Sequence, residues 1–169
     1  MDNPKKNLNP TEYTVEVRNL TRKFGSFTAV DNVSFAVKPG EIFGFLGANG
    51  AGKTTTIRIL CGLLMPTSGT AQVAGYDIYQ DYEKIKFKIG YMSQKFSLYS
   101  DLTVRENIQF YGGIYGLSRQ NIKQKTQELL AYLGLEKEAD TLTIDLPLGW
   151  KQRLALSTAI IHNPQIIFL

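Results

Sequence analysis

The stretch Gly47-Ala-Asn-Gly-Ala-Gly-Lys-Thr54 has the spacing of a phosphate-binding loop, with one glycine, four further residues and then Gly-Lys-Thr. Before it, residues 41–46 form an almost continuous apolar run, which is typical of a strand buried on both faces. After it, residues 55–62 predict a helix that Gly62 ends. A strand, a glycine-rich loop and a helix in this order predict the start of a parallel α/β unit.

The residue types of this loop indicate how it would hold an anion. Glycines let the backbone approach phosphates without a side-chain clash, and successive amides form a concave nest at the positive end of the following helix. We expect the Lys53 ammonium to reach the β- and γ-phosphates of a nucleotide and the Thr54 hydroxyl to bind Mg²⁺. The expected nucleotide contacts in and just after the loop are Gly47, Ala48, Asn49, Gly50, Ala51, Gly52, Lys53, Thr54 and Thr55.

Hydrophobic periodicity divides the rest of the chain into short segments. Alternation at residues 13–17 and 33–37 predicts a small antiparallel sheet near the N-terminus. Residues 82–88 fit a strand by their alternation and a short helix by their context, so both remain open. Two apolar runs, residues 89–92 and 165–169, predict further buried strands.

The central part of the chain predicts helices. Thr103 and Glu106 have the spacing of a capping box and predict a helix from there to about residue 115. Ser118 is expected to cap a second helix that Gly134 ends. A third helix is expected over residues 150–161, stopped by the Asn-Pro pair that follows.

The length and composition are those of a globular protein. A chain of 169 residues is long enough for one compact domain, and 43% hydrophobic with 20% charged residues is ordinary for a globular protein. The formal net charge is +4 and the pI about 9.1, which would suit a nucleic-acid-binding protein. The charges are spread along the chain, however, which favours a mildly basic globular domain, and charge alone does not decide the partner. No nucleic-acid partner is expected.

The sequence gives little sign of a membrane-spanning segment, a secretory signal or a disulfide. No apolar run approaches the roughly 18–20 residues of a membrane-spanning helix, and no apolar stretch follows the basic pair near the N-terminus as in a secretory signal. We therefore expect the product to stay in the cytoplasm. Cys61 is the only cysteine, and its apolar neighbours predict a buried thiol.

Several segments together resemble the ATP-binding domain of ABC transporters. The loop, with Leu46 before it and Thr55 after it, resembles the Walker A segment of these ATPases. Residues 22–25, Arg-Lys-Phe-Gly, look like the A-loop, whose aromatic residue stacks on adenine; here that residue is Phe24. Residues 90–94, Gly-Tyr-Met-Ser-Gln, resemble the Q-loop, and the resemblance implies that Gln94 contacts Mg²⁺ and the attacking water. The implied catalytic residues are Lys53 and Gln94, and the implied metal ligands are Thr54 and Gln94.

The signature segment of the family is matched only in part. Residues 146–153, Leu-Pro-Leu-Gly-Trp-Lys-Gln-Arg, stand where Leu-Ser-Gly-Gly-Gln belongs. The family's serine donates to the γ-phosphate held by the opposite subunit, whereas Pro147 has no donor to offer. The variant is similar to one in a drug-efflux branch of exporters, and the implied contacts with the partner's ATP are Leu146, Pro147, Leu148, Gly149 and Trp150. Trp150 also fits a packing anchor at a helix start.

The resemblance implies an α/β fold: a P-loop NTPase core with an N-terminal antiparallel β subdomain and an inserted α-helical subdomain, truncated before the Walker B carboxylates. The expected divisions are a flexible tail at 1–11 and an incomplete ABC ATPase domain at 12–169, with the β subdomain and P-loop core at 12–94, the helical subdomain at 95–148, and the signature helix and start of the Walker B strand at 149–169. In the family, an Asp-Glu pair directly follows that strand. We therefore expect this stretch alone to be inactive in hydrolysis. His162 lies at a helix end and does not match the switch histidine.

The resemblance implies an ATP-binding subunit of an ABC transporter, an exporter, that couples ATP binding and hydrolysis to transport. ATP and Mg²⁺ are the implied cofactors. The implied partners are a transmembrane permease subunit or domain and a second ATP-binding domain, with the chain peripheral on the inner face of the cell membrane. Two alternatives are a soluble ABC ATPase acting on ribosomes or DNA and a catalytically dead nucleotide-binding fragment. The short helical insert of residues 95–148 favours a transporter over DNA-repair relatives, which carry a long coiled coil there.

Overall fold

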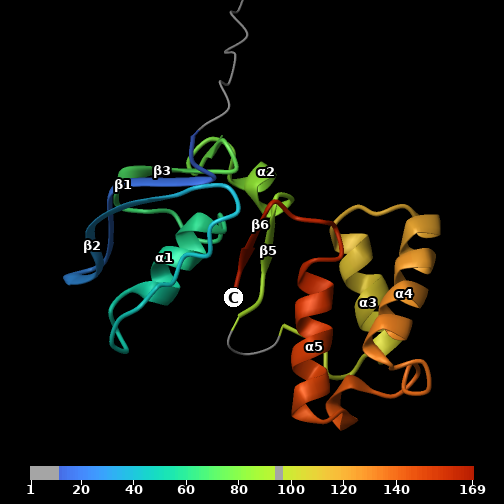
Figure 1. The fold of residues 1–169 in the computed structure, drawn as a ribbon. Coiled ribbons are helices and arrows are strands. Elements are labelled where there is room, and N and C mark those ends of the chain that lie inside the picture. The colour runs from blue at the N-terminus through green and yellow to red at the C-terminus, as the bar shows by residue number, and fades with distance from the viewer. Residues whose placement is uncertain (1–11, 94–96) are drawn as a thin grey trace, which may run out of the picture. The chain divides into compact units, whose positions relative to one another are not determined.

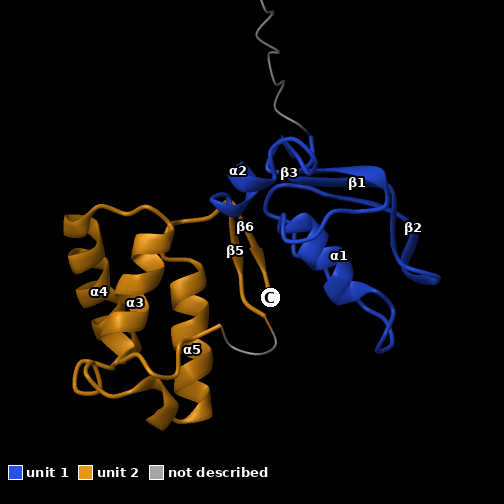
Figure 2. Ribbon diagram, turned by 180° about the vertical axis from the view of Figure 1, so that it is seen from behind, with its two compact units in different colours: residues 1–88 blue, residues 89–169 orange. Residues whose placement is uncertain are grey.

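The computed structural model describes residues 12–93 and 97–169, and its fold is shown in Figure 1. The chain divides into two compact units, residues 1–88 and residues 89–169 (Figure 2). Within the described residues, every helix is too short or too polar to cross a lipid bilayer.

The first unit is built on a four-stranded antiparallel sheet. Its strands are β1 (Val15–Phe24), β2 (Phe27–Val37), β3 (Ser68–Val73) and β4 (Tyr76–Asp77), in the order β2-β1-β3-β4. Val15, Val17 and Leu20 of β1 and Ala71 and Val73 of β3 are buried, so one face of the sheet carries the core of this unit. The predicted N-terminal antiparallel sheet is confirmed, with longer strands than the alternating segments indicated.

The predicted buried strand at residues 41–46 is wrong. This segment has no regular secondary structure, Ile42 is 100% exposed and Leu46 is 94% exposed. A strand requires a hydrogen-bonded neighbour, and none of the described strands pairs with this run. The Phe43 and Phe45 rings instead pack on Phe35 of β2, each with its ring centroid 5.1 Å away.

Two helices complete the first unit. The helix α1 (Lys53–Leu60) follows the glycine-rich loop and starts two residues earlier than predicted. Cys61 caps it and is buried, as predicted, and burial raises the pKa of its thiol to about 12. The ambiguous segment at residues 82–88 contains a short helix, α2 (Tyr82–Lys86), which buries Ile85.

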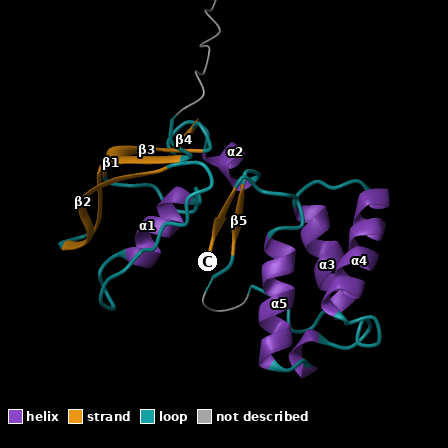
Figure 3. Ribbon diagram, in the orientation of Figure 1, coloured by secondary structure: helices purple, strands orange, loops and turns teal. Residues whose placement is uncertain are grey.

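The second unit combines a parallel strand pair with three packed helices. Strands β5 (Ile89–Tyr91) and β6 (Ile166–Phe168) pair in parallel. Helices α3 (Val104–Ile114), α4 (Arg119–Leu133) and α5 (Leu148–Ala159) lie side by side (Figure 3), and a short 3₁₀ helix, η1 (Thr143–Asp145), precedes α5. Their shared core consists of Val104, Ile108, Leu130, Leu133, Leu135, Ala139, Leu146, Leu154 and Ile161.

The predicted helix caps at Thr103, Ser118 and Gly134 are confirmed in α3 and α4. The Thr103 hydroxyl accepts from the Glu106 amide at 3.2 Å while the Glu106 carboxylate accepts from the Thr103 amide at 2.8 Å, which is the complete capping box. The Ser118 hydroxyl caps α4 by accepting from the Asn121 amide at 3.2 Å. Gly134 ends α4 in the left-handed conformation, with φ 66°.

Two predictions for this unit need correction, the bounds of a helix and the burial of a strand. Helix α5 begins at Leu148 and ends at Ala159, two residues before the predicted start and end, and Pro147 is its N-cap residue. The strand β6 was expected to be buried, yet Ile167 at its centre is about half exposed. Among the described residues β6 pairs with β5 alone, which leaves its other edge and part of its surface uncovered.

Candidate functional site

The glycine-rich loop adopts backbone angles that only glycine tolerates well. Gly50 and Gly52 have φ values of 89° and 78°, in the left-handed region that L side chains rarely enter. These angles turn the chain sharply before α1 begins at Lys53. The sequence pattern of the loop is thus explained by its backbone geometry.

Gly52 is also a point of close packing against the sheet. A Cβ on Gly52 would lie well within 3.0 Å of the Ala29 carbonyl oxygen and 3.2 Å from the Val30 side chain. Arg22 of β1 pairs with Val30, whereas the next residue of β1 pairs with Thr28, so Ala29 is the extra residue of a β-bulge in β2. The bulge of the β1–β2 hairpin therefore lies directly against the loop.

Lys53 folds its side chain back over the loop. Its ammonium group donates to the carbonyl oxygens of Gly47 at 2.6 Å and Ala48 at 2.7 Å. These two bonds hold a positive charge at the loop, next to the first-turn amides of α1, which have no acceptor within the helix. The partial positive charge of the helix N-terminus adds to the same field. The arrangement suits a multiply charged anion.

Two threonine hydroxyls at the start of α1 have different roles. The buried Thr56 hydroxyl donates to the Gly52 carbonyl oxygen at 3.0 Å and so stabilises the first turn of the helix. Thr54 is exposed, which leaves its hydroxyl accessible to a ligand. A Mg²⁺ ion commonly takes few protein ligands and completes its coordination with phosphate oxygens and water. A single hydroxyl at this position therefore fits a phosphate-bound magnesium ion.

Phe24 lies at the tip of the hairpin whose bulge contacts the loop. It ends β1, pairs with Phe27 across a two-residue turn, and is 46% exposed. It follows Arg22 by two residues, roughly 7 Å along the strand. Since Arg22 pairs with Val30, and Val30 lies at Gly52, the hairpin that ends at Phe24 lies against the loop.

The sequence reasoning missed two further side chains at this tip. Phe27 is 62% exposed, and the Arg22 guanidinium carbon lies 4.5 Å from the centroid of the Phe24 ring. The signal for the second contact was present in the sequence, because residues two apart on a strand face the same side.

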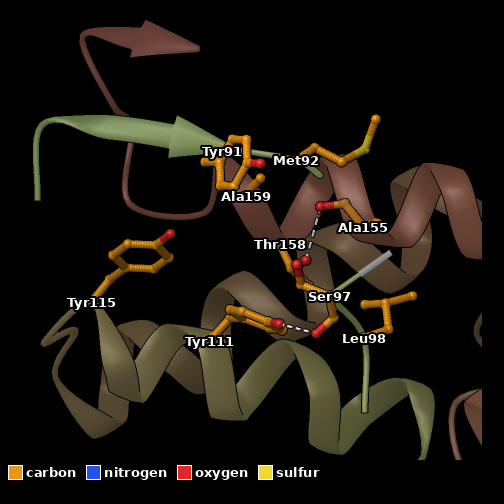
Figure 4. Close-up of a pocket in the computed structure, with 9 residues that line it drawn as sticks. All are labelled: Tyr91, Met92, Ser97, Leu98, Tyr111, Tyr115, Ala155, Thr158 and Ala159. Atoms are coloured by element: carbon orange, nitrogen blue, oxygen red, sulfur yellow. Dashed lines mark hydrogen bonds between the residues drawn. The ribbon is translucent and has the colours of Figure 1, made fainter. Parts of the chain in front are cut away.

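Gln94, the predicted Q-loop residue, lies outside the described residues. Two residues earlier in the sequence, the Met92 amide donates to the Phe168 carbonyl oxygen at 2.9 Å and extends the pairing of β5 with β6. A cavity of about 20 Å³ in this unit, shown in Figure 4, is large enough for about one water molecule. Its lining consists of Tyr91, Met92, Ser97, Leu98, Tyr111, Tyr115, Ala155, Thr158 and Ala159. At this size the cavity is a packing feature and not a substrate site.

The signature segment forms the start of α5. Pro147 is the N-cap residue and makes no side-chain cap hydrogen bond, and Leu146 before it is buried in the core. Leu148 and Gly149 are exposed, so this helix start is accessible. Trp150 packs against the core of the unit, which supports its interpretation as a packing anchor.

His162 has a structural environment. Its Nε2 lies 3.0 Å from the Ile89 carbonyl oxygen, and its ring stacks on Tyr115 with centroids 3.6 Å apart. Burial lowers the pKa of this imidazole, with the bond to Ile89 acting weakly in the opposite direction. Among the described residues, no group of three or more His, Cys, Asp or Glu side chains could hold a metal ion.

The comparison with protein families agrees with this geometry. The family model described as ABC transporter matches residues 30–169. The chain belongs to the ABC transporter family. This family member is 51% identical, over 95% of its length, to the probable multidrug ABC transporter ATP-binding protein YbhF of Escherichia coli (strain K12). It is 38% identical, over 92% of its length, to the linearmycin resistance ATP-binding protein LnrL of Bacillus subtilis (strain 168). It spans 28% of the length of YbhF and 50% of that of LnrL.

Solved structures show the same fold. A structure described as the ATP binding subunit of an ABC transporter has a TM-score of 0.80 and 28% identity, covering 91% of this chain and 64% of that one. The dimeric post-hydrolysis state of the ATP-binding cassette MJ0796, bound to ADP and Pi, has a TM-score of 0.78 and 30% identity, covering 90% of this chain and 72% of that one. The expected α/β P-loop fold, with its antiparallel sheet and helical part, is thereby confirmed.

Proposed function

We propose that this chain is the ATP-binding part of an ABC exporter that couples ATP binding and hydrolysis to transport. The observation that carries this proposal is the Lys53 ammonium held on the loop carbonyls, beside the first-turn amides of α1. Relatives whose names refer to multidrug transport and linearmycin resistance support the direction of transport. A structural neighbour bound to ADP and Pi supports a nucleotide ligand.

In this proposal each part of the first unit binds a different part of ATP. The backbone from Gly47 to Thr55 surrounds the phosphates, and Lys53 exchanges its two carbonyl partners for phosphate oxygens. Thr54 would hold Mg²⁺, which supplies charge neutralisation at the phosphates. The exposed Phe24 ring stacks on the adenine. Gln94, as a second magnesium ligand that orients the attacking water, rests on the family resemblance.

The proposal includes two protein partners. A transmembrane permease would receive the movement that nucleotide binding drives, with this chain on the inner face of the membrane. A second ATP-binding domain would contact the bound nucleotide through its own exposed start of α5, and the dimeric state of a structural neighbour supports this pairing. The same proposal includes the division into a β subdomain and P-loop core at 12–94, a helical subdomain at 95–148, and a signature helix with the start of the Walker B strand at 149–169.

We also propose that residues 1–169 alone hydrolyse ATP no faster than background. No Asp-Glu pair follows β6 within these residues, so they do not include the carboxylate that, in the family, activates the attacking water. Phosphate release should be compared between this chain and a longer form that continues into such a pair. Equal rates for the two would refute this part.

The binding proposal is tested by replacing Lys53. We expect Lys53→Ala to weaken ATP binding at least about tenfold, because the charge at the outer phosphates is lost. Lys23→Ala is the matched control, since Lys23 is an exposed lysine of the same unit. Isothermal titration of ATP measures both variants. An unchanged affinity in folded Lys53→Ala protein would refute phosphate binding by this loop.

An ATPase acting on ribosomes or DNA is the second candidate, and the net charge of +4 is the observation that favours it. Co-purification distinguishes the two. Recovery of this chain, or of a longer form of it, with membrane proteins supports the exporter, and recovery with nucleic acid supports the alternative.

A further inference from the structure

We propose that Arg22 is a positioning residue for Phe24, covering one face of its ring so that a nucleotide base stacks on the other face only. This inference rests on the proposed function, in which Phe24 contacts the adenine. From the sequence, Arg22 is notable only as the residue two positions before Phe24.

The first support is the contact itself. The Arg22 guanidinium carbon lies 4.5 Å from the centroid of the Phe24 ring, within the range of a cation–π interaction. A guanidinium at this distance occupies the space that a stacked base would need on that face. Phe24 as a whole residue is still 46% exposed, so the contact with Arg22 does not bury it.

The second support is that the guanidinium is fixed in place. Its Nη1 donates to the Met65 carbonyl oxygen at 2.9 Å, in the segment that follows α1. The Lys23 amide donates to the Thr67 hydroxyl at 2.9 Å, and the Thr67 amide donates to the Thr21 carbonyl oxygen at 2.8 Å. The end of β1 is therefore attached to residues 65–67 at several points, and Arg22 is one of them.

The third support is the burial of one nitrogen of the guanidinium. The Arg22 Nε is buried and has no hydrogen-bond partner among the described residues. A partly desolvated cation gains more from an aromatic face than a hydrated one does, so the ring compensates for lost hydration. The contact between Arg22 and Phe24 is therefore favourable before any ligand binds. A ring that is already held loses less rotational freedom when a base stacks on it.

Phe27, the other aromatic residue at the hairpin tip, has no such contact with a cation. It pairs with Phe24 across the turn and is 62% exposed, and no cation lies over its ring among the described residues. The hairpin tip therefore offers two aromatic rings, of which only Phe24 is held by a guanidinium. This difference assigns the base-stacking position to Phe24 and the positioning role to Arg22.

The test separates base binding from phosphate binding. ATP and inorganic tripolyphosphate are titrated into the 169-residue chain and into Arg22→Met, Arg22→Lys, Phe24→Ala and the Arg22→Met/Phe24→Ala double variant. Arg18→Met is the matched control, because Arg18 is an exposed arginine of the same strand that pairs with Glu16. Thermal unfolding confirms that each variant is folded.

We expect Arg22→Met to weaken ATP binding about threefold to tenfold and to leave tripolyphosphate binding unchanged. Arg22→Lys, which keeps a cation, should recover part of the loss, and Arg22→Met should have no further effect in the Phe24→Ala background. Equal weakening for both ligands, or an additive loss in the double variant, would overturn the inference. If Phe24→Ala weakens ATP binding and Arg22→Met does not, the positioning role alone fails. If Phe24→Ala has no effect, the adenine contact of the proposed function fails as well.

Discussion

Gly52 lies directly against the carbonyl oxygen of Ala29, with no room between them for a Cβ. Ala29 is the bulged residue of β2, and its hairpin ends at the exposed Phe24 ring. One packing contact therefore connects the loop proposed to bind phosphate with the strand pair proposed to bind the base.

We expect Gly52→Ala to lower both the melting temperature and the affinity for ATP. The new methyl group would overlap the Ala29 oxygen, and the left-handed backbone adds strain. Gly75→Ala is a matched control, because Gly75 has the same φ of 78° and a methyl group there would meet no other atom within 4 Å. A thermal melt of both variants tests this. Equal losses would mean that backbone strain alone, and not the contact with Ala29, makes glycine necessary at position 52.

The capping box of α3 predicts a graded response at Thr103. Thr103→Ala removes the acceptor for the Glu106 amide and should cost about 1 kcal/mol of unfolding free energy. Thr103→Ser keeps the hydroxyl and should cost much less. Urea unfolding of the two variants provides the measurement. A loss of the same size in Thr103→Ser would show that the methyl group, and not the cap, stabilises this end of the helix.

Core packing predicts a large loss of unfolding free energy at one leucine of α5 and a small change at another. Leu154 is fully buried among the three helices, so Leu154→Ala should cost about 2–5 kcal/mol. Leu148 on the same helix is 65% exposed, and Leu148→Ala should change stability by about 0.5 kcal/mol or less. Chemical unfolding compares them. A large loss in Leu148→Ala would reveal a packing role that its exposure does not indicate.

His162 predicts a loss of stability in mild acid. Burial lowers its pKa below the ordinary value of 6.5, so the unfolded chain binds the proton first as the pH falls. Its contribution is therefore present above about pH 6.5 and is lost as the pH falls toward the lower folded-state pKa. His162→Phe keeps a ring against Tyr115 and cannot titrate, so its melting temperature should fall less between about pH 7 and about pH 5.5. It is the only histidine in the chain, and identical pH profiles would exclude this role.

Local chemistry explains which features the sequence predicts. The glycines of the loop, the Thr103 and Ser118 caps and the Gly134 helix end depend on the residue itself and its near neighbours in the chain. Such features need no knowledge of distant contacts. The family resemblance added Phe24 at the hairpin tip, which no local pattern distinguishes from an ordinary strand residue.

Contacts between distant residues explain what the sequence did not predict. Residues 41–46 have the composition of a buried strand, but strand formation depends on a partner elsewhere in the chain. The buried Asn107 amide donates to the Thr143 hydroxyl at 2.8 Å, across 36 positions of the chain. The stack of His162 on Tyr115 likewise joins residues that are far apart in sequence. No periodicity marks these pairs.

We expect the irregular run at residues 41–46 to affect the thermodynamics of ligand binding. Within the described part of the chain, its backbone from Ile42 to Leu46 makes no hydrogen bond, although it leads directly into the loop at Gly47. Fixing the backbone of one residue costs on the order of 1–2 kcal/mol in lost conformational entropy. A nucleotide that orders this run on binding therefore forfeits part of its intrinsic affinity. Dissociation constants measured on residues 1–169 should accordingly be upper limits for any longer form in which a neighbouring strand holds the run in advance.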